Sequence, residues 1–150
     1  MPAPATLTGQ DVGEAEGALT ALLNQVLSNT DITRTQYITL RVLALRGPAP
    51  SPAELHDYLA SQPQLGLDRS QIAELLHGLE AKGLVAGSAA DGPGPTRLTA
   101  EGAALHTRLA EAVGAVTRRV YAGLDPDDLA TTHRVLVEVA ERAGRLREKS

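Results

Sequence analysis

The chain has 150 residues and a formal net charge of −4 at pH 7, with 43% hydrophobic but only 2% aromatic residues. This length fits one domain, or one domain with a long helical arm, and the core must come from Leu, Val and Ala. The absence of cysteine excludes disulfides and thiol redox sensing. We expect a cytoplasmic protein, because no signal peptide is recognisable and no apolar run approaches the roughly 20 residues that span a bilayer.

The first third of the chain predicts two helices after a disordered N-terminal segment. Residues 1–12 are rich in Pro, Ala and Thr, which is typical of disorder. A first helix is predicted over about 13–29, where apolar residues recur at helical spacing: Leu19, Leu22, Leu23, Val26 and Leu27. Thr33 and Gln36 form a capping box that opens a second helix over about 34–46. This second helix is apolar on most faces, so it should be buried at the centre of a lobe.

Two further helices are predicted on either side of the linker 61–66. Ser51, Pro52 and Glu54 form a strong helix start, with an N-cap, a first-position Pro and an acid three residues after the cap. The linker is longer than a tight helix-turn-helix turn. Asp68 then caps a helix that ends near Lys82, before Gly83. Its apolar stripe is Ile72, Leu75, Leu76 and Leu79.

The segment after this helix reads as strand, loop and returning strand. Leu84 and Val85 begin a short strand, and the Gly- and Pro-rich stretch 86–95 is a loop. The order helix, strand, loop, strand is that of the second half of a winged helix-turn-helix. In such modules the helix enters a DNA major groove.

The last third predicts two long helices. Thr99 caps a helix over about 100–122, and Asp125 with Pro126 starts another over about 126–147. Capping and macrodipole effects explain Asp125, Asp127 and Asp128 better than a metal site formed with His133. No catalytic, nucleotide-binding or metal-ligand motif is recognisable, so we expect neither an enzyme nor a bound cofactor or metal.

Several blocks together resemble the MarR family of bacterial winged-helix regulators. They are TRTQYITLRVLAL (33–45), SPAELHDYLA (51–60), LDRSQIAELLHGLEAKGLV (67–85), RLTAEGAAL (97–105) and GLDPDDLATTHRVL (123–136). The resemblance covers about residues 15–147 and implies a mainly α fold with a small β wing. It implies one domain over 13–150, with a winged-helix lobe at about 31–99 and dimerisation helices at about 13–29 and 100–147. It also implies an obligate homodimer, and many members release DNA when a small, often phenolic, molecule binds.

The residues predicted to bind double-stranded DNA lie mainly on the recognition helix. They are Ser51, Arg69, Ser70, Gln71, His77, Lys82 and Arg97. Arg69, Ser70 and Gln71 carry groups that hydrogen-bond base edges or phosphates, and the helix start at Ser51 suits a phosphate. Arg34 and Arg46 would add charge. A dimer of such lobes would read a pseudo-palindromic operator and, as a repressor, would be released by an effector.

An alternative interpretation is a winged-helix dimer with weak or lost DNA binding that acts as a ligand sensor or protein-interaction module. Residues 51–99 carry three basic and six acidic residues, although DNA affinity leans on Lys and Arg. The loop places Gly-Pro-Gly after Asp91, where the family usually has a basic residue. Glu74 and Gly78 stand where many relatives place arginines.

The family's ligand pocket lies between the dimer body and the DNA lobe. By position, it would be lined by Leu23, Leu27, Tyr37, Arg41 and His106. Tyr37 offers a ring and a hydroxyl, and Arg41 offers a partner for an anion. The predicted effector is therefore a small phenolic or anionic molecule.

Overall fold

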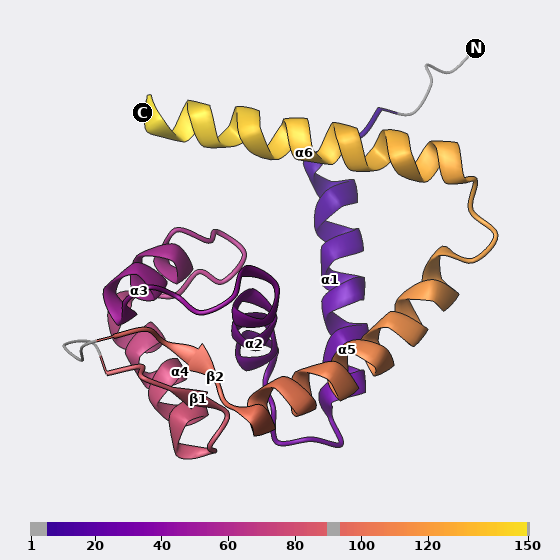
Figure 1. Cartoon of the computed structure of the whole chain (residues 1–150). Coiled ribbons are helices and arrows are strands. Elements are labelled where there is room, and N and C mark those ends of the chain that lie inside the picture. Colours follow the sequence, from indigo (N-terminus) through magenta and orange to yellow (C-terminus); the bar gives the residue numbers. More distant parts are fainter. Residues whose placement is uncertain (1–5, 90–93, 150) are drawn as a thin grey trace, which may run out of the picture. The chain divides into compact units, whose positions relative to one another are not determined.

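The computed structural model describes residues 6–89 and 94–149 of the chain (Figure 1). In order, its elements are α1 (Gly9–Leu27), α2 (Arg34–Arg46), α3 (Pro52–Ala60), α4 (Arg69–Ala81), β1 (Val85–Ala86), β2 (Arg97–Leu98), α5 (Ala100–Tyr121) and α6 (Pro126–Glu148). This mainly helical fold with a small two-stranded wing confirms the predicted fold class. The chain divides into two compact units, Met1–Val113 and Gly114–Ser150, and the division falls inside α5.

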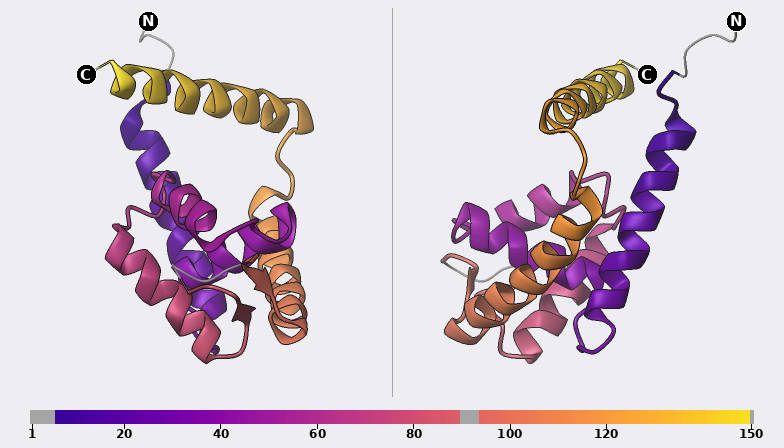
Figure 2. Two further views of the ribbon diagram at one scale, coloured as in Figure 1. Left: turned by 60° about the vertical axis from the view of Figure 1, so that its left-hand side comes forward. Right: turned by 90° about the vertical axis from the view of Figure 1, so that its right-hand side faces the viewer.

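Helix α2 lies at the centre of the first unit. It contacts α1, α4 and β2, while α3 packs against α4 (Figure 2). Tyr37, Ile38, Leu40 and Leu43 of α2 are all buried, as predicted. Leu45, however, is 76% exposed, so the prediction of a helix buried nearly all round is wrong on one face. The reason is helical geometry, because residues 41, 44 and 45 share one stripe of the helix and all three are exposed.

The recognition helix α4 is fixed by its apolar stripe. All four predicted residues of that stripe are buried: Ile72, Leu75, Leu76 and Leu79. The predicted capping box is present, with the Gln71 N–H donating to Asp68 Oδ1 at 2.8 Å and the Asp68 N–H donating to Gln71 Oε1 at 3.0 Å. After the helix, Gly83 adopts a φ of 76°, a conformation that glycine tolerates best. Sequence patterning therefore predicted this helix and both of its ends correctly.

The linker between α3 and α4 contributes one residue, Leu65, to the core. The Leu65 N–H donates to the Gln62 carbonyl at 3.1 Å, and the Leu65 side chain is only 7% exposed. Burial of a leucine side chain contributes roughly 1.5–3 kcal/mol to folding. Leu65 thus anchors the linker to the core of the lobe.

The base of the wing is tied to the connection between α2 and α3. In the antiparallel pair β1–β2, Val85 lies opposite Leu98. An isolated bridge joins Ala49 to Thr96, and the Thr96 hydroxyl donates to the Gly87 carbonyl at 2.6 Å. The tip of the predicted wing, residues 90–93 with Asp91, lies outside the described residues.

Helix α1 begins at Gly9, four residues before the predicted start. The sequence signal was a capping box, in which Thr8 and Asp11 exchange hydrogen bonds of 3.1 and 2.9 Å. The prediction of disorder through residue 12 is therefore wrong for residues 9–12, while residues 1–5 lie outside the described part of the chain.

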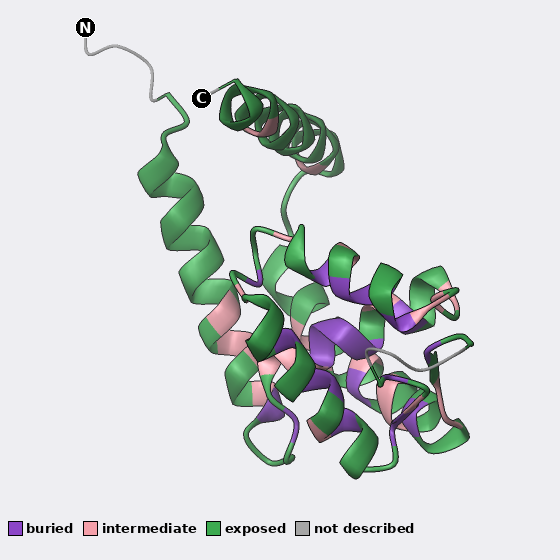
Figure 3. Cartoon of the chain, turned by 90° about the vertical axis from the view of Figure 1, so that its left-hand side faces the viewer, coloured by how far each residue is buried: buried purple, intermediate pink, exposed green. Residues whose placement is uncertain are grey.

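Helix α6, in the second unit, has no buried residue among those described (Figure 3). Its start follows the predicted pattern, because the Asp125 carboxylate accepts hydrogen bonds from the N–H groups of Asp127 and Asp128 at 2.7 and 3.3 Å. Four of its large apolar side chains are 38–46% exposed: Val135, Leu136, Val137 and Val139. Across residues 6–89 and 94–149, no helix has the length and apolar character needed to cross a bilayer.

Candidate nucleic-acid interface

The first turn of α4 presents the predicted reading residues to solvent. Arg69, Ser70 and Gln71 are all exposed. The Arg69 guanidinium pairs with the Asp57 carboxylate of α3 at 2.5 Å, and both side chains are more than half exposed. An exposed ion pair contributes about 0–1 kcal/mol. A DNA phosphate can therefore compete with Asp57 for Arg69.

Two predicted contact residues also cap helices. The Ser51 hydroxyl accepts a hydrogen bond from the Glu54 N–H at 3.2 Å, which fixes the start of α3. Gln71 uses its carbonyl oxygen in the capping box of α4, and its amide nitrogen is the group that can donate to a base edge or phosphate. Capping thus orients both side chains before any ligand arrives.

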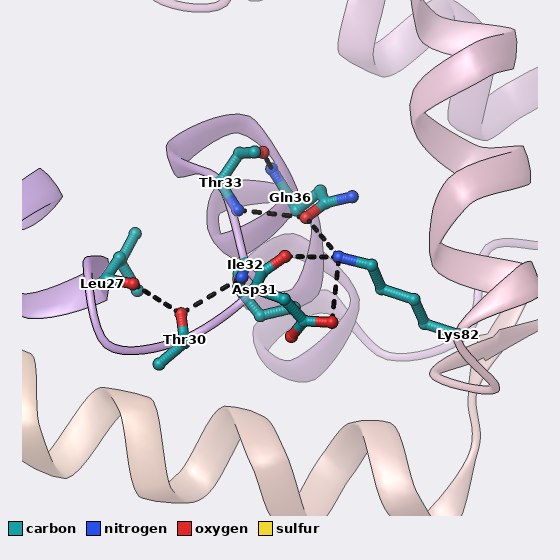
Figure 4. A network of polar contacts seen from close by, with 7 residues as sticks. All are labelled: Leu27, Thr30, Asp31, Ile32, Thr33, Gln36 and Lys82. Carbon is teal, nitrogen blue, oxygen red and sulfur yellow. Dashed lines mark hydrogen bonds and ion pairs between the residues drawn. The ribbon is translucent and has the colours of Figure 1, made fainter.

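The Lys82 side chain points toward the turn between α1 and α2 (Figure 4). Its ammonium donates to the Asp31 carbonyl and to Gln36 Oε1, the latter at 3.3 Å, and lies 3.5 Å from the Asp31 carboxylate. In the same turn the Thr30 hydroxyl donates to the Leu27 carbonyl at 2.7 Å and accepts from the Ile32 N–H at 3.1 Å. Lys82 therefore links the end of the recognition helix to the start of α2.

Three other arginines of the lobe and His77 each lie in a different setting. Arg34 lies 3.6 Å from a carboxylate oxygen of Glu16 on α1. The Arg46 guanidinium lies over the Tyr58 ring, 4.1 Å from its centroid. Arg97 is exposed on β2, at the base of the wing. His77 is exposed on α4 and lines a small cavity beside the start of the wing.

The predicted effector residues within the first unit include a stacked pair. The rings of Tyr37 and His106 stack with centroids 6.0 Å apart and an interplanar angle of 23°. Leu27 is buried, and Leu23 packs against the same core. Burial lowers the pKa of His106, and the positive charge of Arg41 lowers it further. Burial raises the pKa of Tyr37, which Arg41 partly opposes.

Solved structures with similar folds include wild-type MarR from E. coli in its apo form, which is 25% identical with a TM-score of 0.66 over 90% of this chain and 98% of that one. A MarR family protein from Bacillus stearothermophilus is 20% identical with a TM-score of 0.66, and the match covers 93% of this chain and 99% of that protein. NadR in complex with 4-hydroxyphenylacetate is 25% identical with a TM-score of 0.69, and the match covers 93% of this chain and 98% of NadR. The chain has the MarR winged-helix fold. No protein-family model and no curated protein matches it.

A MarR-like structure implies a transcriptional regulator rather than an enzyme. Within this MarR fold, the structure reveals the acidic partners of three predicted cations: Asp57 for Arg69, Asp31 for Lys82 and Glu16 for Arg34. Sequence reasoning missed these partners because they lie 12, 51 and 18 positions away along the chain. Only the packing of α3 against α4, and of α1 and α4 against α2, brings the opposite charges together.

Proposed function

We propose that the protein is a homodimeric, DNA-binding transcriptional regulator of the cytoplasm, acting as a repressor that a small-molecule effector releases. The observation that carries the proposal is the geometry of α4. Its buried stripe fixes the helix to the lobe, while Arg69, Ser70 and Gln71 of its first turn remain exposed. A helix held in this way can enter a major groove, and the twin helix of a dimer can enter the next one.

The second candidate function is a winged-helix dimer that binds DNA weakly or not at all and serves as a sensor or protein partner. The acidic composition of residues 51–99 supports it, as do the carboxylates that hold Arg69 and Lys82. These carboxylates compete with phosphate for the cations on which DNA affinity depends. The two candidates differ in salt dependence, whereas their oligomeric state is the same.

The deciding experiment is fluorescence anisotropy with DNA from upstream of the protein's own gene, at several salt concentrations and with non-specific competitor. If each protomer neutralises three phosphates, the slope of log affinity against log salt is about −5 for the dimer. Competitor-resistant, salt-sensitive binding supports the regulator. A folded dimer that fails to bind at low salt supports the second candidate.

Three variants test whether α4 faces the DNA. Arg69→Ala should weaken specific binding by about 1–3 kcal/mol, because a groove or phosphate contact is lost. Asp57→Asn should tighten binding, because it releases Arg69 and removes a negative charge. Arg142→Ala is the matched control, because it removes an exposed arginine that is also paired with a carboxylate but lies on α6, outside the winged-helix lobe. If Arg69→Ala leaves the affinity unchanged, Arg69 is not part of the interface.

For the effector, we propose a small phenolic or anionic molecule bound near Tyr37, Arg41 and His106. The stacked rings offer an aromatic surface, and Arg41 offers a positive charge to a carboxylate. One structural relative, NadR, is described in complex with 4-hydroxyphenylacetate, a phenol that carries a carboxylate. Adding this compound to the protein–DNA complex should lower the anisotropy, and the Arg41→Ala variant should respond less.

A further inference from the structure

Lys82 differs from Arg69 in how firmly the protein holds its charge. The side chain of Lys82 is 30% exposed, whereas that of Arg69 is 72% exposed. The Lys82 ammonium reaches three oxygen atoms, namely the Asp31 carbonyl, an Asp31 carboxylate oxygen and Gln36 Oε1 (Figure 4). An ammonium has three N–H donors, so these acceptors can occupy all of them. A DNA phosphate that recruited Lys82 would have to replace several internal contacts at once.

The acceptors of Lys82 belong to the turn between α1 and α2 and to the first turn of α2. Gln36 Oε1 also accepts the Thr33 N–H at 3.0 Å, as part of the capping box of α2. The turn has hydrogen bonds of its own, made by the Thr30 hydroxyl. Lys82 therefore attaches the end of α4 to a segment whose shape is already fixed.

A second set of hydrogen bonds holds the residues that follow Lys82. The Gly83 carbonyl accepts the Thr99 hydroxyl at 2.6 Å, and the Leu84 carbonyl accepts the Thr99 N–H at 3.0 Å. Thr99 lies between β2 and the start of α5. The C-terminal end of α4 is thus tied both to the turn before α2 and to the junction of β2 with α5.

The reading residues lie at the other end of α4, in its first turn. A helix of 13 residues is roughly 20 Å long, so a tilt of about 5° at one end moves the other end by roughly 2 Å. Hydrogen bonds to base edges need donor–acceptor distances within a few tenths of an ångström of the optimum. Attraction of a cation to the phosphate backbone carries no sequence information and is less sensitive to such a shift. The fixed end of α4 should therefore matter more for base reading than for affinity to any DNA.

We propose that Lys82 is a positioning residue that sets the orientation of α4 for base reading, in place of the direct DNA contact that the sequence predicts. The inference rests on the proposed function of the lobe. It can be separated from a purely electrostatic role by sign. Loss of the Lys82 charge weakens attraction to phosphate, whereas loss of the Asp31 charge strengthens it. If the two residues act as one positioning contact, removal of either side chain should impair specific binding.

The experiment compares the affinity of folded dimers for the upstream DNA and for random-sequence DNA of the same length, by anisotropy at one salt concentration. Lys82→Met keeps the aliphatic stem and should lower the ratio of the two affinities by about tenfold. Asp31→Ala should lower the ratio in the same direction but less, because the Asp31 carbonyl and Gln36 still accept from Lys82. The Asp31 side chain is 82% exposed, so this variant should keep the fold. Lys149→Met, at an exposed lysine just after α6, is the matched control and should keep the wild-type ratio.

Three results would overturn the positioning role. The first is tighter binding by Asp31→Ala, as expected for Asp57→Asn, since Lys82 would then be a phosphate contact that Asp31 restrains. The second is an equal loss of affinity for both DNAs in Lys82→Met, which is the behaviour of a phosphate contact. The third is a wild-type ratio in folded Lys82→Met, which would leave the network a role in stability alone. A wild-type protein that does not prefer the upstream DNA would overturn the proposed function and this role together, whereas the three results above overturn this role alone.

Discussion

Helices α4 and α6 show how one sequence pattern leads to two different structural outcomes. Both carry apolar residues at helical spacing along one face. In α4 the whole stripe is buried inside the lobe, whereas α6 has no buried residue among those described. Helical periodicity therefore indicates that one face of a helix is apolar and favours burial. It does not show whether the surface that buries this face belongs to the same chain.

The difference has an energetic consequence. A buried leucine or valine side chain contributes roughly 1.5–3 kcal/mol relative to an exposed one. The stripe of α4 gains this free energy when a single chain folds. The stripe of α6 gains it only when a further apolar surface covers it, and a second copy of the chain is the partner that the proposed homodimer supplies. Stability of the lobe and stability of the dimer should therefore respond to different substitutions.

The substitution Val139→Asp should have the largest effect and should act on the dimer alone. Val139 is 46% exposed on α6, so an aspartate there is tolerated by the single chain. At a covered interface the same carboxylate would be buried without a partner, and such burial is strongly unfavourable. We expect dimer affinity to fall at least ~100-fold, which corresponds to about 2.7 kcal/mol.

Sedimentation velocity over a concentration series measures this change, and circular dichroism checks that the helices persist. Arg142→Ala is the matched control on the same helix, because Arg142 is exposed and already pairs with Glu138 at 2.5 Å. A Val139→Asp protein that remains as dimeric as the control would show that α6 is not part of the interface.

The substitution Gly102→Ala should have an intermediate effect and should act on the first unit. Gly102 is buried at the start of α5, and a Cβ atom there would overlap the carbonyl oxygen of Leu84. The strand and helix would have to move apart, and such overpacking typically costs about 1–3 kcal/mol. Urea denaturation measures the loss in the free energy of unfolding.

Gly78→Ala provides the contrast for this prediction. Gly78 lies inside α4, and a Cβ atom there would meet only the Gln36 side chain, at an ordinary contact distance of 3.6 Å. Alanine in a helix interior is favoured over glycine by roughly 0.5–1 kcal/mol, so this variant should be slightly more stable than the wild type. Equal effects of the two substitutions would contradict the close approach of α5 to Leu84.

These contrasts explain how far the sequence could predict the structure. Local signals such as the Thr33–Gln36 and Asp68–Gln71 boxes predicted helix starts correctly, because a cap and its partner are neighbours in the chain. The same signal at Thr8 was overlooked, and the start of α1 was therefore placed too late. Leu45 was wrongly predicted to be buried, because hydrophobicity alone does not say which side of a helix other elements cover.

The candidate interface was less predictable for a related reason. Residue type and position named Arg69 and Lys82, but pairing with Asp57 and Asp31 depends on how distant elements pack. In the same way, His56 and His77 line one small cavity only because α3 packs against α4. By contrast, His106 and Tyr37 were placed together in the predicted ligand pocket, and their rings do stack, while the pocket itself stays a prediction. Local chemistry can thus be read from a sequence, whereas electrostatic partners require the fold.

The smallest of the three effects is a pH dependence that again separates a buried from an exposed position. His106 is partly buried against Tyr37 and Arg41, and its pKa is lowered mainly by burial. The unfolded chain therefore binds a proton at this residue at higher pH than the folded chain does. The stability that a neutral His106 provides is present above the ordinary histidine pKa of about 6.5 and is lost as the pH falls below that value.

The His106→Phe variant keeps a ring beside Tyr37 and removes the titrating group. The free energy of unfolding of this variant should therefore fall less between pH 7.5 and pH 5.5 than that of the wild type. Urea denaturation at both pH values tests this, with His133→Asn on α6 as the matched control that should keep the wild-type dependence. An identical loss of stability in the His106→Phe variant would mean that the burial of this ring is not coupled to folding.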